Sequence, residues 1–93
     1  MPKSIEKTAV VTSDTAVRTG LTTVWWVAVS AGATGGPFQL NDSTDDSGTD
    51  MLNLTMAATT TLFLNFCMSP IEFKTGLYID VQGTNVTVNV GWT

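Results

Sequence analysis

The segment Leu21–Ser30 reads LTTVWWVAVS and is the longest apolar run of the chain. β-Branched and aromatic residues dominate it, and such side chains suit a pleated, half-buried surface better than a helix. The glycine-rich segment 32–37 ends the run with a turn signal. The run therefore predicts a strand, and its length and apolar character make it the expected central strand of the fold.

Alternation along this strand divides its side chains between two faces. One face is expected to carry Val24, Trp26, Ala28 and Ser30, and the other Trp25, Val27 and Val29. Both faces then hold large apolar groups, so one would line the core while the other meets a second layer such as a neighbouring subunit. The alternative is a sandwich with one tryptophan on its surface. The residues predicted for a subunit interface are Ile5, Trp25, Trp26, Val27 and Trp92.

Strands are also expected over most of the remaining chain, because threonine, valine and aromatic residues recur and no dozen-residue segment shows a helical period. The expected strands are 8–12, 15–19, 37–41, 51–54, 62–66, 71–73, 77–81 and 86–90. Segments 37–41 and 51–54 form a hairpin with a solvated tip, and 77–81 and 86–90 form a terminal one. Pro70 marks a switch between sheets.

These strands predict one all-β domain, a single jelly-roll-like β-sandwich of about eight short antiparallel strands over residues 8–93. Residues 1–7 form an N-terminal arm of mixed charge that needs a partner to become ordered. Trp92 lies near the end of the chain, where a tryptophan plugs either the rim of the sandwich or the surface of a partner.

Composition excludes several classes of function. The chain of 93 residues has 13% charged residues, no histidine and one cysteine, so it offers neither a disulfide nor the usual ligands of a zinc site. Four Lys and Arg against eight Asp and Glu give a net charge of -4, which repels nucleic-acid backbones. No apolar window is long enough to span a bilayer. We therefore expect no cofactor, no metal, no nucleic acid and no membrane.

Catalytic chemistry has few residues available. An enzyme would depend on carboxylates alone, such as Asp80 with Glu72, and both occupy positions that alternation predicts to be outward and solvated. Cys67 has no basic neighbour in sequence that would lower its pKa. The sequence predicts a protein that is not an enzyme and has no catalytic residues.

The segment 42–50 reads DSTDDSGTD and concentrates four aspartates around one glycine. Several converging carboxylates could hold a hard cation, but the spacing lacks the Asp-x-Asp-x-Asp-Gly core and the final glutamate of an EF-hand. Ser, Asp and Gly are also the residues that turns contain. A solvated loop is the preferred interpretation, and a cation site is the alternative.

The segment Pro70–Thr84, PIEFKTGLYIDVQGT, followed by a strand of alternating valines, resembles a family of small β-sandwich proteins encoded by tailed bacteriophages. The resemblance covers roughly residues 8 to 91 and includes the order of the preceding strands. The chain departs from the family at Trp25-Trp26, at the polar segment 42–50 and at Trp92. These departures are where a particular partner would be met.

This resemblance implies a structural component of a virion, made in the host cytoplasm and most simply a capsid decoration or cement protein. The expected partners are further copies of the chain, by analogy a homotrimer, and the major capsid protein or another virion protein. The alternative is a tail- or fibre-associated module that binds a receptor or glycan. Its exposed aromatic rings would stack on sugars, and the candidates are Trp25, Trp26, Tyr78 and Trp92.

Overall fold

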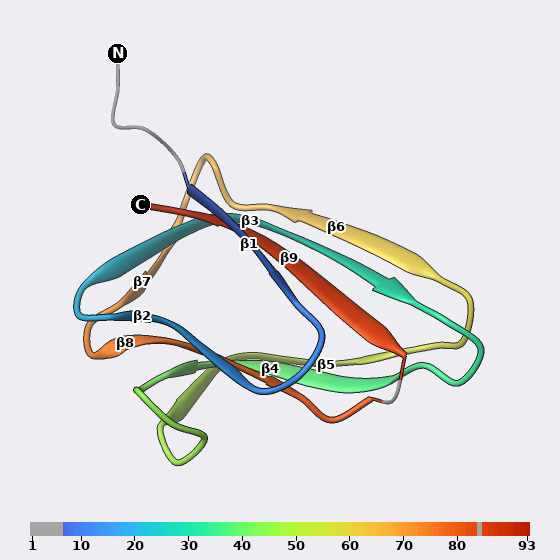
Figure 1. Cartoon of the computed structure of the whole chain (residues 1–93). Helices are drawn as coiled ribbons and strands as arrows, with labels where there is room; N and C mark the ends of the chain where they lie inside the picture. The colour runs from blue at the N-terminus through green and yellow to red at the C-terminus, as the bar shows by residue number, and fades with distance from the viewer. Residues whose placement is uncertain (1–6, 84) are drawn as a thin grey trace.

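A computed structural model describes residues 7–83 and 85–93, which form two antiparallel sheets packed face to face (Figure 1). The expectation of a single all-β sandwich is confirmed. The strands in chain order are β1 Lys7–Val11, β2 Thr15–Thr19, β3 Thr22–Ala31, β4 Gly36–Asp42, β5 Thr49–Met56, β6 Thr61–Asn65, β7 Ile71–Phe73, β8 Gly76–Val81 and β9 Val86–Trp92. Lys7, expected in the arm, belongs to β1; Ile5 and the rest of the arm lie outside the described residues.

The two sheets divide the strands by a simple rule. Sheet A has the order β1-β9-β3-β6, with β7 also paired to β3, and sheet B has the order β2-β8-β4-β5. The pairs β4·β5, β3·β6, β2·β8 and β1·β9 are nested, each enclosing the one before along the chain. The chain is thus wound like one long folded ribbon, which is the jelly-roll-like arrangement that the sequence predicted.

Several local predictions are also settled by the pairing. The expected central strand is confirmed, since β3 pairs with β6, β7 and β9. The hairpin of β4 with β5 is confirmed as well. The predicted terminal hairpin is wrong, because β8 belongs to sheet B and β9 to sheet A. The predicted sheet switch at Pro70 is also wrong: β6 and β7 both pair with β3, and the chain changes sheet only at the following turn.

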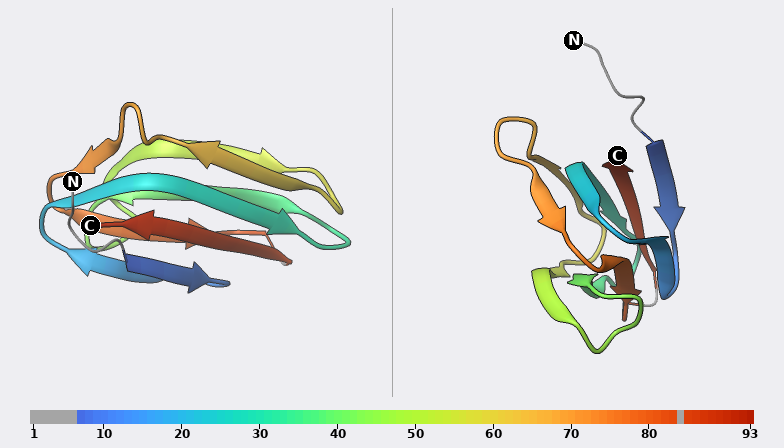
Figure 2. Two further views of the ribbon diagram at one scale, coloured as in Figure 1. Left: turned by 90° about the horizontal axis from the view of Figure 1, so that it is seen from above. Right: turned by 90° about the vertical axis from the view of Figure 1, so that its left-hand side faces the viewer.

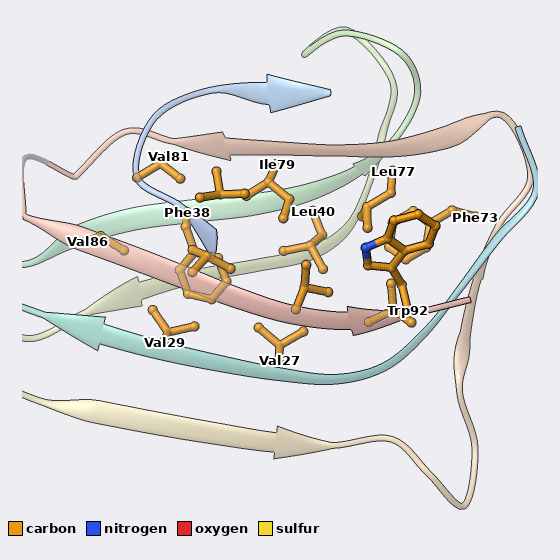
Figure 3. Close-up of a cluster of buried hydrophobic side chains, with 14 of the residues drawn as sticks. Val27, Val29, Phe38, Leu40, Phe73, Leu77, Ile79, Val81, Val86 and Trp92 are labelled. Carbon is orange, nitrogen blue, oxygen red and sulfur yellow. The ribbon is translucent and has the colours of Figure 1, made fainter. Parts of the chain in front are cut away.

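The core lies between the sheets and is almost entirely aliphatic and aromatic (Figure 3). The buried residues of sheet A are chiefly valines, whereas sheet B contributes larger side chains such as Phe38, Leu40 and Ile79. Small β-branched residues from one layer thus meet bulkier ones from the other, which lets the layers interdigitate.

Trp92 closes one end of this core. It is only 8% exposed, and in Figure 3 its ring lies beside Phe73 and Leu77. The Nζ of Lys7 and the Cζ of Arg18 lie 5.5 and 5.4 Å from its ring centroid, so two cations stack over it from β1 and β2. Of the two positions considered for this tryptophan, the structure shows the rim of its own sandwich.

This arrangement predicts that replacing Trp92 lowers the free energy of unfolding more than replacing one of the two cations over its ring. Trp92→Ala should lower the free energy of unfolding by about 3–5 kcal/mol, because it leaves a cavity at the end of the core. Arg18→Ala should lower it by about 0.5–1 kcal/mol, the usual size of an exposed cation–π contact. Urea denaturation followed by fluorescence measures both. A Trp92→Ala variant within 1 kcal/mol of the wild type would contradict the assignment.

Candidate functional site

The strand β3 contains an irregularity that decides which of its side chains face outward. Val24 pairs with Trp92 and Trp26 with Gly91, so Trp25 is an extra residue, a β-bulge, opposite β9. The bulge shifts the alternation by one residue. Val24 therefore faces the core together with Val27 and Val29, which corrects the predicted division of this strand.

The bulge also places the two neighbouring tryptophans in different environments. The Nε1 of Trp25 donates a hydrogen bond to the Oγ1 of Thr93 (3.0 Å), and its carbonyl oxygen accepts one from the N–H of Phe66 (2.7 Å). Trp25 thus ties the start of the β6–β7 turn to the end of the chain. Trp26 turns onto the outer face of sheet A, where its ring lies 6.1 Å from that of Phe63.

The residues predicted for an interface therefore do not lie together on one surface. Trp25 and Trp26 are half-buried and reach the surface, whereas Val27 is 0% exposed in the core and Trp92 is the buried plug. Ile5 lies outside the described residues. Phe63, which the sequence analysis did not single out, is 60% exposed beside Trp26. Its signal was an aromatic residue on the otherwise polar side of its strand, between Thr61 and Asn65.

The outer face of sheet A is uncharged over its four main strands. The outward positions on the described residues of these strands include Thr8, Val10, Thr23, Trp26, Ala28, Ser30, Thr61, Phe63, Asn65, Thr87, Asn89 and Gly91. At one end of the same face, the exposed Glu72 of β7 pairs with Thr23. Hydroxyl and amide groups thus surround a small aromatic centre. Such a face can make van der Waals contacts and neutral hydrogen bonds without removing a charge from water.

Sheet B and its loops carry the aspartates instead, whereas Glu72 lies on β7 in sheet A. All six aspartates of the sequence lie there: Asp14, Asp42, Asp45, Asp46, Asp50 and Asp80. Partial burial raises the pKa of Tyr78, and the carboxylates of Asp14, Asp46, Asp80 and Asp45 raise it further. This face therefore has a negative potential that repels anions.

Asp42 and Asp45 of the 42–50 segment act as hydrogen-bond acceptors. The Oδ1 of Asp45 accepts from the N–H of Ser47 (2.8 Å) and the Oγ of Ser43 (3.1 Å), while the Oδ1 of Asp42 accepts from the N–H of Thr75 (2.7 Å). Burial acts to raise the pKa of Asp42, but backbone donors and Lys74 bring it below 3.8. Within residues 7–83 and 85–93, no three His, Cys, Asp or Glu side chains form a metal-binding group.

Asp80 is the most enclosed acid on this face, with 6% exposure. Burial raises its pKa above 3.8, and a hydrogen bond to the side chain of Asp14 raises it further, while a bond from the Nε2 of Gln82 (3.2 Å) acts in the opposite direction. The Oδ1 of Asp14 also accepts from the N–H of Val81 (3.0 Å). Glu72, the other acid considered for catalysis, lies on β7 in sheet A, so the sheets separate the two.

Comparison with known proteins adds no relative: no family model matches the chain, and no curated protein or solved structure is similar to it. The described residues form no helix that could cross a membrane. The aromatic pair on sheet A, the exposed edge strand β1 and the acidic face of sheet B are therefore the features from which a function can be argued.

The Asp14–Asp80 contact predicts a definite pH dependence. Because the folded-state pKa of Asp80 lies above its unfolded value of 3.8, its stabilising contribution is complete below pH 3.8 and is lost as the pH rises through the folded-state pKa. Asp80→Asn removes this loss and keeps a hydrogen-bonding group. It should raise the Tm at pH 7 by about 4–8 °C, the shift that about 1 kcal/mol makes in a small domain.

Thermal unfolding between pH 3.5 and 7.5 measures this effect, with Asp50→Asn as the control because Asp50 is exposed on β5. The wild type should lose stability across this range relative to Asp80→Asn. Parallel Tm–pH curves for the wild type and Asp80→Asn would show that folding does not raise the pKa of Asp80.

Proposed function

We propose that this chain is a non-enzymatic structural protein of a bacteriophage virion, a capsid decoration or cement protein that attaches through the edge strand β1. The observation that carries the proposal is the position of β1. In the described structure it pairs on one side only, with β9, and its Val10 is 68% exposed. An edge strand of this kind offers unpaired N–H and C=O groups to another chain.

The sequence preceding β1 strengthens this proposal. Residues 1–6, MPKSIE, precede the edge strand in the sequence and are expected from the sequence to need a partner. Val10 lies beside the free edge and can add an apolar contact to the backbone hydrogen bonds. A partner strand added here would extend sheet A without disturbing the core.

The setting of the virion comes from the resemblance to small phage β-sandwich proteins and from the winding of the chain. Jelly rolls occur in viral capsid proteins and in lectin domains, which is an argument from analogy of fold. The partners would be the major capsid protein or another virion protein, together with further copies of this chain, by analogy as a homotrimer. The protein would be made in the host cytoplasm and located in the virion.

The alternative, a tail- or fibre-associated module that binds a receptor or glycan, is favoured by a different observation. Trp26 and Phe63 form an aromatic pair on the outer face of sheet A, and amide and hydroxyl side chains surround it. Of the four aromatic residues considered for sugar stacking, Trp26 alone belongs to this pair. Trp25 is hydrogen-bonded to Thr93, Trp92 is buried and Tyr78 lies on sheet B.

Quantitative mass spectrometry of purified virions from the phage that encodes this chain tests the main proposal. The chain should be present in many copies. Removal of residues 1–6, or Val10→Lys at the edge strand, should lower its occupancy at least tenfold, because a strand edge carrying lysine resists pairing. Val10 is exposed, so this variant should fold.

Leu21→Ser is the matched control, since Leu21 is an exposed apolar residue in the β2–β3 turn, away from β1. Its occupancy should equal that of the wild type. Absence of the chain from virions would overturn the structural assignment. Presence with full occupancy in both edge variants would overturn attachment through β1, and density at the tail in electron microscopy would favour the alternative.

A further inference from the structure

The outer face of sheet A holds two aromatic rings that are tilted relative to each other. Trp26 on β3 and Phe63 on β6 have ring centroids 6.1 Å apart and planes inclined by 33°. Phe63 projects from the strand that borders the sheet, with Leu62 and Leu64 on either side facing the core. The two rings therefore form a small continuous aromatic surface that spans neighbouring strands.

Gly91 sets the orientation of the tryptophan ring. A Cβ atom at Gly91 would overlap Nε1, Cε2 and Cδ1 of Trp26, three adjacent atoms of the five-membered ring. Close approach to all three places the ring face over Gly91 rather than its edge. The indole thus lies flat on the sheet over Gly91, an arrangement that a larger residue at position 91 would prevent.

Neutral hydrogen-bonding groups surround these rings. Asn65 pairs with Trp26 across β3 and β6, and Asn89 lies next to Ala28 on β9. The Oδ1 of Asn65 accepts the N–H of Cys67 (2.9 Å), which fixes the amide and leaves its Nδ2 as the donor that it can offer to a ligand. Ser30, Thr61 and Thr87 add hydroxyl groups one row further along.

We propose that this surface is a binding site for a neutral saccharide, with Trp26 and Phe63 as the stacking platform and Asn65 and Asn89 as hydrogen-bonding groups. A pyranose ring has an apolar face of C–H groups and an equatorial rim of hydroxyls. The C–H face matches an aromatic platform, and the rim of hydroxyls matches uncharged amides and hydroxyls. The open, flat form suits an extended sugar chain rather than a single terminal sugar.

The size of the face favours a saccharide over a protein partner. Four strands about 4.8 Å apart and three outward rows about 6.7 Å apart cover on the order of 400 Å². A stable protein interface buries about 800 Å² on each partner, roughly twice this area. A short run of sugar units needs much less, because its contacts concentrate on the rings.

The charge of the molecule selects among saccharides. With a net charge of -4 and six aspartates on the opposite side of a thin sandwich, an anionic polysaccharide would be repelled. A neutral polysaccharide would not be repelled. This inference deepens the glycan-binding alternative proposed above and does not rest on attachment through β1. Phe63 on β6 lies at the opposite edge of sheet A from β1, whereas Asn89 on β9 pairs with Val10.

Affinity electrophoresis in native gels containing soluble neutral polysaccharides, namely a glucan, a galactomannan and a xyloglucan, provides the test, with polygalacturonate as the acidic comparison. The wild type should be retarded by at least one neutral polymer and not by polygalacturonate. Phe63→Ser should weaken binding about tenfold, which corresponds to about 1.4 kcal/mol. Leu21→Ser, an equally exposed apolar residue elsewhere, should bind like the wild type.

Gly91→Ala provides an independent variant, because it displaces the Trp26 ring without removing either aromatic residue. It should also reduce retardation, and circular dichroism should show both variants to be folded. Tryptophan emission of the wild type should change on adding the retarding polymer, and a Trp26→Phe variant should lose this change.

Three results would overturn the proposal. The first is the absence of retardation by all the neutral polymers, and the second is unchanged retardation of Phe63→Ser. The third is light scattering that shows a wild-type oligomer dissociated by Phe63→Ser, which would make the face a contact between copies of the chain. Loss of virion occupancy in the β1 variants with normal sugar binding would separate this site from the attachment surface.

Discussion

The bulge at Trp25 is the constraint on which the arrangement of this protein depends. A regular β3 would put Val24 on one face and Val27 and Val29 on the other, so one end of the strand would turn its valines away from the core. The extra residue opposite β9 brings all three inward. Trp26 remains on the face opposite Val27 and Val29, over Gly91 and beside Phe63. The bulge thus lets Val24 join the core while Trp26 keeps its place on the outer surface of sheet A.

The nested pairing of the strands then separates two kinds of surface. Because β8 and the β4–β5 hairpin belong to sheet B, the aspartates gather on that side, in Figure 1 the lower layer. The hydroxyl, amide and aromatic residues of β3, β6 and β9 remain on sheet A. Figure 2 shows the same two layers from above and from one end. A sandwich with one aspartate-rich face and one face that is uncharged over β1, β9, β3 and β6 can meet two partners of different chemistry.

Much of the fold could be predicted from the sequence because alternation has a fixed period in a strand. The β4–β5 hairpin and the central place of β3 followed from such patterns. Alternation does not say which strand lies alongside, so the turn between β8 and β9 was interpreted as a hairpin although it joins the two sheets. The bulge could not be predicted for the same reason, because it is defined by the register of β3 against β9.

The candidate site was only partly predictable for the same reason. Trp26 was expected to reach the surface. Phe63 and Gly91 are its neighbours only because β3 pairs with β6 and β9. The sequence left open whether Trp92 plugs the rim of the sandwich or the surface of a partner, and the structure places it at the rim with Lys7 and Arg18 over its ring. Neighbours that are distant in sequence decided each of these positions.

Proton NMR tests the position of the Trp26 ring, and with it the bulge, most directly. If the indole lies face-on over Gly91, ring currents should shift one Gly91 Hα strongly upfield, and nuclear Overhauser effects should connect that proton to Hε1 and Hδ1 of Trp26. An unshifted Gly91 Hα, together with contacts from the Trp26 ring to the methyl groups of Val27 or Val29 in the core, would contradict the account.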